Sequence, residues 1–253
     1  MKGCTTMRKM IQKFILLTVS LIASLFINIS VKAEENFDNL NNIEIMNEYS
    51  KMYKLTDHEY NTLLYKLNHN IPWDSAINEN IDNIPEIYKY ISLEEYQKGI
   101  TSKIYRFEDG SIFSISINSE GSLPVRKKRS VTTYSSGSMY NQHLFTLNKG
   151  TQRAQMRISG WLGNPAYNSL SYINEAFGGS VSGFGTNGDA RSRIIRKNEN
   201  ATQAALAELT WSSNINLGYS WAGFGGSTNR GTTCHMYVAF YKGRVFVNST
   251  IPL

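Results

Sequence analysis

The sequence predicts an α+β protein, with a small N-terminal segment of helices and a β-hairpin followed by a mainly-β, sandwich or barrel-like C-terminal domain. Three observations predict this class. Apolar residues recur at helical spacing before residue 70, and they alternate with polar residues from residue 104 onward. In addition, 15 of the 19 glycines lie beyond residue 125, where a chain of many short strands needs its turns.

The chain begins with the three parts of a secretory signal peptide. Four cations and no acidic residue occupy the first 13 positions, an apolar run of 17 residues follows from Phe14 to Ser30, and small residues precede Glu34 at −3 and −1. A transmembrane anchor is the alternative, but this run is at the short limit for a bilayer about 30 Å thick. We therefore expect cleavage after Ala33, and a secreted, extracellular product that retains no stable transmembrane segment.

Charge divides the rest of the chain into two segments. Residues 34–125 hold 16 acidic and 7 basic residues, a net charge of −9, whereas residues 126–253 hold 14 basic and 4 acidic residues, a net charge of +10. Between them lie four consecutive cations and a serine: Arg126, Lys127, Lys128, Arg129 and Ser130. A solvated basic linker explains most such runs, but the position of this one also predicts a protease site. We expect an acidic pro-region or spacer at 34–125 and a cleavable basic linker at 126–140.

Helix signals dominate the first part of the acidic segment. Thr56 and Glu59 have the spacing of a capping box, and apolar residues follow at helical spacing as far as Leu67. Ser92 and Glu95 repeat the capping pattern, which predicts a further, short helix.

The period of the apolar residues then changes to two. Two strand-like runs flank Asp109 and Gly110, a dipeptide typical of hairpin turns, and Phe113, Ile115 and Ile117 fall on one face of the second run. The acidic segment is therefore expected to end in a β-hairpin.

Residues 141–253 are predicted to form a basic, glycine-rich, all-β domain. Apolar and polar residues alternate around Met156, and again over 205–221, where two strands are expected to join near Ser213. A terminal hairpin is predicted around Lys242-Gly243. The segment Tyr167–Phe177 admits a short helix and is left open.

Cys234 is the only cysteine left after removal of the signal peptide, so no internal disulfide can support the fold. Its position in a predicted strand favours a buried, unreactive thiol. The neighbouring His235 cannot serve it as a base, because adjacent side chains of a strand point to opposite faces. A pairing of Cys234 with His143 in space is the remaining route to a nucleophile.

Catalytic and cofactor motifs are not found. The sequence has no Gly-x-Ser-x-Gly, no His-Glu-x-x-His and no phosphate-binding loop, and His58 and His69 have no partners at metal-ligand spacing. We therefore expect a protein that is not an enzyme, without catalytic residues, cofactor or metal.

The excess of cations in an exported domain favours an anionic partner. Nucleic acid is disfavoured, because no binding motif is present and the signal peptide directs the protein out of the cell. The expected partners are therefore an anionic cell envelope or lipid surface and the protease that processes the chain. The candidate surface-binding residues are Arg153, Arg157, Arg191, Arg193, Arg196 and Lys197.

The order of signal peptide, acidic segment, basic run and basic β domain resembles that of exported precursors such as large unmodified bacteriocins and some secreted toxins. It is a likeness of organisation, without a diagnostic motif. It implies a secreted bacterial precursor whose basic β domain binds or acts on cell envelopes after cleavage near Arg129. One alternative is a non-enzymatic adhesion module of the cell surface, and another is a hydrolase that uses Cys234 or Glu208.

Overall fold

The computed structural model describes residues 43–44, 46–69, 71–119, 132–183, 189–213 and 232–250. The chain divides into two units after Glu48, and every helix and strand named below belongs to the second unit. The predicted signal peptide, its cleavage point at Ala33 and the basic run 126–130 lie outside the described residues.

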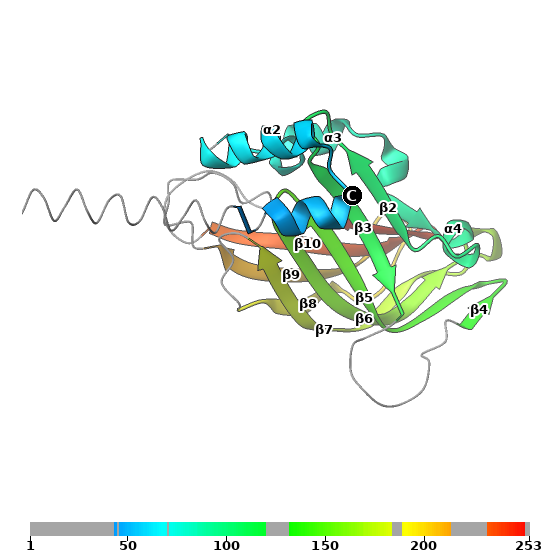
Figure 1. The fold of residues 1–253 in the computed structure, drawn as a ribbon. Coiled ribbons are helices and arrows are strands. Elements are labelled where there is room, and N and C mark those ends of the chain that lie inside the picture. The colour runs from blue at the N-terminus through cyan, green and yellow to red at the C-terminus, as the bar shows by residue number, and fades with distance from the viewer. Residues whose placement is uncertain are drawn as a thin grey trace, which may run out of the picture. The chain divides into compact units, whose positions relative to one another are not determined.

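Two antiparallel sheets facing each other make up a β-sandwich-like body, which confirms the α+β class with a mainly-β part (Figure 1). The first sheet has the strand order β1-β11-β10-β9-β8, and the second has the order β2-β3-β5-β6-β7, with β4 paired to β5. The strands of the first sheet are β1 (Tyr90–Ser92), β8 (Arg191–Arg196), β9 (Ala205–Ser213), β10 (Thr232–Tyr241) and β11 (Arg244–Asn248). Those of the second are β2 (Ser102–Arg106), β3 (Ile112–Asn118), β4 (Thr132–Tyr134), β5 (Gly137–Lys149), β6 (Gln152–Gly163) and β7 (Tyr172–Gly183).

The named helices are short and belong mostly to the acidic segment. They are α2 (Asp57–Asn68), α3 (Asn78–Asn83) and α4 (Leu93–Gln97), with 3-10 turns η1 (Asp74–Ala76), η2 (Glu86–Tyr88) and η3 (Pro165–Tyr167). Both predicted capping boxes are confirmed. Thr56 caps α2 through Glu59, and Ser92 caps α4 through Glu95. In the parts of the chain that the structure describes, no helix is long and apolar enough to cross a bilayer.

The predicted hairpin around Asp109-Gly110 is confirmed, and it anchors α2. Lys66 of α2 donates to the Asp109 carboxylate at 2.7 Å and to Asp74 of η1 at 2.9 Å. Gly110 has φ +86°, and a Cβ there would lie 2.5 Å from the Cβ of Glu59, so only glycine fits this close approach.

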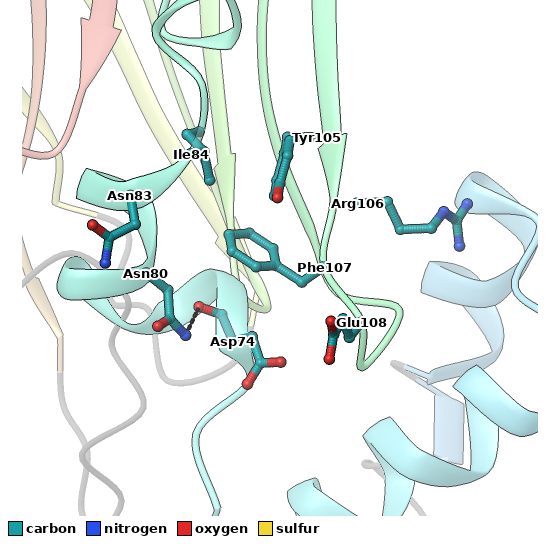
Figure 2. A pocket seen from close by; sticks show the side chains of 8 residues that line it. All are labelled: Asp74, Asn80, Asn83, Ile84, Tyr105, Arg106, Phe107 and Glu108. Carbon is teal, nitrogen blue, oxygen red and sulfur yellow. Dashed lines mark hydrogen bonds between the residues drawn. The ribbon is translucent and has the colours of Figure 1, made fainter.

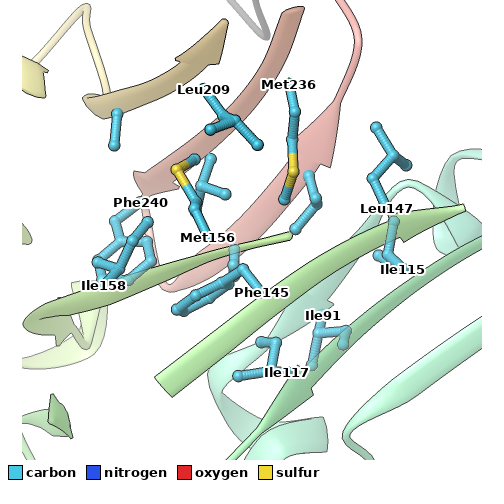
Figure 3. Close-up of a cluster of buried hydrophobic side chains, with 14 of the residues drawn as sticks. Ile91, Ile115, Ile117, Phe145, Leu147, Met156, Ile158, Leu209, Met236 and Phe240 are labelled. Carbon is cyan, nitrogen blue, oxygen red and sulfur yellow. The ribbon is translucent and has the colours of Figure 1, made fainter. Parts of the chain in front are cut away.

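The core lies between the inner faces of the two sheets (Figure 3). The alternation of apolar residues predicted around Met156 and over 205–213 is confirmed, since these apolar positions are buried there. Fully buried residues drawn from both sheets are Ile115, Ile117, Phe145, Leu147, Met156, Ile158, Leu209, Met236 and Phe240.

The acidic and basic segments share both sheets. β1 of the acidic segment pairs with β11, with Ile91 opposite Val245, and β3 pairs with β5, with Ile115 opposite Leu147. The stretch expected to be a linker at 126–140 is strand in part, because it contains β4 and the start of β5 at Gly137. Serine, threonine and glycine dominate residues 132–138, which hides the strand periodicity there.

The remaining local predictions have mixed outcomes. The segment Tyr167–Phe177, for which the sequence did not decide between helix and strand, holds the end of η3 and the start of strand β7. Strand β9 ends at Ser213, and the second strand expected before residue 221 lies outside the described residues. The terminal hairpin is confirmed, with positive φ at Lys242 and Gly243 in its turn.

Candidate binding face

The outer face of the first sheet gathers cations and aromatic rings. Along β9 the inner positions are apolar and buried in the core, so that Leu206, Glu208 and Thr210 point outward. The register places Arg193 of β8 and Tyr237 of β10 on either side of Glu208. The outward residues of this face are Tyr90, Arg191, Arg193, Arg196, Leu206, Glu208, Thr210, His235, Tyr237, Tyr241, Arg244 and Phe246.

Glu208 is the charged centre of this face. Its side chain is only 2% exposed, and it accepts from Arg193 Nε at 2.5 Å and pairs with His235 Nδ1 at 2.8 Å. Burial opposes ionisation of the carboxyl, but hydrogen bonds with Arg193, His235 and Tyr237 outweigh it and lower the pKa of Glu208. Glu208 is thus a fixed anion that holds Arg193 and His235 in place.

Aromatic side chains line the same face beyond Glu208. The rings of His235 and Tyr237 stack with centroids 5.7 Å apart, and those of Tyr90 and Phe246 lie 5.4 Å apart. The guanidinium of Arg244 lies 4.4 Å from the centroid of the Tyr90 ring. Rings and cations therefore lie together on this face, with the Tyr237 ring itself buried. Sequence reasoning missed these rings, although their period-two positions on β10 and β11 could have shown that they share a face.

An apolar patch also lies on this face. It consists of the buried residues Ala204, Leu206, Tyr237 and Ala239. Tyr241 and Phe246 pack against it, and the Lys242 ammonium lies 4.7 Å from the Tyr241 ring centroid.

The structure brings together only some of the cations predicted to bind an anionic surface. Arg191, Arg193 and Arg196 all belong to β8, and Lys197 follows them directly. Arg191, Arg193 and Lys197 are exposed, whereas Arg196 is half-buried and donates to the carbonyl of Ala204 at 2.8 Å.

Arg153 and Arg157 lie apart from that group, on β6 of the second sheet. Both are half-buried, and the side chain of Arg157 packs beside Gly178 of β7. The sequence pattern correctly indicated that they point away from the core, but it could not indicate which sheet would carry them.

Cys234 is a buried core residue that forms no disulfide within the described part of the chain. Burial raises the pKa of this thiol to about 11, so that it stays protonated at neutral pH. His143, its hypothetical partner, is also buried and accepts from the backbone N–H of Asn141 at 2.9 Å through Nδ1. His235 lies on the opposite face of β10 from Cys234, as predicted, and contacts Glu208.

A hollow of about 290 Å³ lies between the turn η1, helix α3 and strand β2 (Figure 2). Phe107 is one of the residues that line it, and Arg106 points away toward the helices, where it pairs with Glu59 at 2.8 Å. Its carboxylates are Asp74 and Glu108, and Asp74 is already held by Lys66. The hollow therefore offers no arrangement of nucleophile and base.

Metal-ligand groupings do not occur among the residues that the structure describes: no three His, Cys, Asp or Glu side chains come together. His58 and His69 are exposed, and His69 stacks on Tyr65 with ring centroids 4.0 Å apart.

In comparisons with known proteins, no protein-family model, curated protein or solved structure matches the chain.

Proposed function

We propose that this is a secreted, non-enzymatic protein that binds anionic cell-envelope or lipid surfaces through the outer face of its first sheet. The observation that carries the proposal is the row of arginines on β8, Arg191, Arg193 and Arg196, on the same face as the rings of His235 and Tyr237.

The chemistry of the face suits phosphate and carboxylate groups on a surface. A guanidinium can donate two parallel hydrogen bonds to one phosphate, and each cation held near an anionic membrane contributes about 1 kcal/mol to binding. The Arg193 side chain is 69% exposed while Glu208 holds it from below, so the guanidinium is oriented and still reachable. Tyrosine rings suit the boundary between polar headgroups and apolar chains.

The same contacts argue against the hydrolase alternative. Glu208 is already engaged by three side chains, and Cys234 is a protonated thiol inside the core. Neither residue lines the hollow of Figure 2.

Processing near Arg129 stays part of the proposal, in a modified form. A cut in the run 126–129 would fall between β3 and β5, which are neighbours in the second sheet. We therefore expect the two products to remain associated after the cut, because the pairing and the core hold them together.

The strand pairing also favours the second candidate, an adhesion module that needs no activation. The acidic segment supplies β1, β2 and β3 to the sheets, and Arg191 and Arg193 are already exposed in the uncut chain. Equal binding of anionic vesicles by cut and uncut protein would favour this candidate, whereas a gain on cutting would favour an activated precursor.

The binding face can be tested with two matched double variants. Arg191→Ser with Lys197→Ser removes two cations from the proposed face without disturbing Glu208, and Arg153→Ser with Arg157→Ser removes two from the second sheet. On vesicles of phosphatidylglycerol and phosphatidylcholine at low salt, we expect the first variant to bind about tenfold more weakly or worse, and the second to change little. Equal losses of vesicle binding in both variants would mean that net charge alone drives binding. Unchanged binding in the first variant would rule out the proposed face.

A further inference from the structure

Lys149 is a fully buried lysine at one end of the sandwich. It follows Phe145 and Leu147 at the next inward position of β5, and its exposed fraction is 0%. Lysine is among the residues least often buried, because its ammonium loses strong hydration, so its position between the sheets needs a specific explanation.

The Lys149 ammonium is held against the amide side chain of Asn78. Its Nζ donates to Asn78 Oδ1, and also to Ser249 Oγ at 3.0 Å. Asn78 is the first residue of α3, and Ser75 in the preceding turn η1 accepts from the backbone N–H of Gly150 at 3.2 Å. The β5–β6 turn is thus held to the start of α3 through Lys149 and to the preceding turn η1 through Gly150.

The surroundings shift the balance of Lys149 toward the uncharged amine. Burial lowers the pKa of Lys149 to about 8, against the opposing influence of negative charge at Asp82 and Glu79. A minor fraction of this amine is therefore unprotonated and nucleophilic near neutral pH, a much larger fraction than in an exposed lysine, whose pKa is about 10.4.

From this juxtaposition we propose that Lys149 and Asn78 become joined by an amide bond between the lysine Nζ and the asparagine Cγ. The reaction needs no external reagent. The lone pair of Nζ forms a bond to Cγ, the bond from Cγ to the side-chain nitrogen of Asn78 breaks, and that nitrogen leaves with the protons as ammonium. A charged lysine and a neutral amide thus give a neutral secondary amide and an ammonium ion, so atoms and charge balance.

The bond would join the acidic to the basic segment of the chain. The two residues are 71 positions apart, and the basic run 126–129 lies between them. A chain cut in that run would remain one covalent molecule. In a protein without a disulfide among its described residues, the bond would also supply a cross-link that reducing agents do not break.

The test is peptide mapping of the secreted full-length protein by mass spectrometry after denaturation and trypsin digestion. We expect the intact mass to fall about 17 Da below that of the sequence from its observed N-terminus, which is the mass of ammonia. We also expect residues 67–89 and 130–153 to be recovered as one joined species, because trypsin does not cut after an acylated Lys149. An intact mass equal to that of the sequence would overturn the proposal. So would a lower intact mass if the two peptides were still recovered separately.

Variants separate the cross-link from a hydrogen bond. Lys149→Arg keeps the charge but should restore separate peptides, and Asn78→Asp should give the same joined peptides with the loss of water, about 18 Da. Asn80→Ala, on the same helix, is the matched control and should keep the joined species. Joined peptides in Lys149→Arg would assign the link to other residues. The readout involves neither vesicles nor processing, so its failure is distinct from failure of the proposed function.

Discussion

Cys234 illustrates how a single position can look functional in the sequence and be structural in the fold. It is the only cysteine among the described residues, it stands next to a histidine, and it lies opposite Trp211 of β9 in the buried core. The sequence alone predicted this, because side chains alternate along β10 and Cys234 and His235 must therefore point to opposite faces.

Replacing Cys234 with serine tests whether the thiol belongs to the core. The change places a hydroxyl in an apolar core, and we expect the free energy of unfolding to fall by about 1–3 kcal/mol, measured by urea denaturation. Cys234→Ala, which leaves only a small cavity, separates the loss of packing from the burial of the hydroxyl. In the native protein the thiol should react slowly with disulfide reagents. An unchanged stability in the serine variant would contradict its assignment to the core.

Glu208 shows what residue-level reasoning missed. Its even-numbered position on β9 predicts an outward side chain, and outward it is, yet it is almost completely covered. Its hydrogen-bond partners Arg193 and Tyr237 come from two other strands, and a single strand pattern cannot anticipate neighbours from distant parts of the sequence.

Among the elements, α2 is tied to the β2–β3 hairpin by charge. Lys66 bridges Asp109 in the turn and Asp74 in η1. Burial raises the energy of the Asp109 carboxylate, but hydrogen bonds from Lys66, Ser111 and the Asp74 backbone outweigh this cost and lower its pKa. Helix α2, the β2–β3 turn and η1 are therefore held together by one ionised group, the Asp109 carboxylate.

This arrangement predicts a loss of stability in acid. Since the folded pKa of Asp109 is lowered, its contribution is complete above the unfolded pKa of about 4 and disappears as the pH falls through the lower folded value. We expect Asp109→Asn to unfold more easily at pH 7, by about 1–3 kcal/mol, and to lose less stability than the parent below pH 4. Thermal denaturation across pH measures both.

The control for this prediction is Glu94→Gln. The Glu94 side chain is 76% exposed and pairs with Lys98 on the surface of α4, so its removal should have little effect on stability. A parallel pH dependence in parent and Asp109→Asn would contradict the assigned role of Asp109.

Elements were predictable from the sequence where their signals are local. Both capping boxes and both predicted hairpins depend on residues within a few positions of one another, and they are confirmed. Strand partners were not predictable, because the β1–β11 and β3–β5 pairings join residues that composition had assigned to different segments. For the same reason, the sequence could not show that the arginines of β6 and those of β8 lie on different sheets.

At the scale of the whole molecule, the two oppositely charged segments form one folded unit from Tyr49 onward. A cut in the run 126–129 should therefore leave a single particle. After limited trypsin treatment we expect both products to elute together in size-exclusion chromatography without denaturant, and the far-ultraviolet circular dichroism to stay the same. Separate elution of a β-rich product that begins near Ser130 would instead support an acidic segment that comes away on processing.

The pairing of β1 with β11 also sets the order in which the chain can fold. Tyr90 pairs with Phe246, which is far from it in the sequence. The first sheet therefore cannot be completed until the last hairpin has formed. Contacts so distant in sequence require closure of a long loop, which slows folding to the millisecond-to-second range typical of β-sandwiches. While the chain is still emerging from a ribosome, its N-terminal part lacks the partner strands β5 and β11, so neither sheet can be completed before most of the chain has been made.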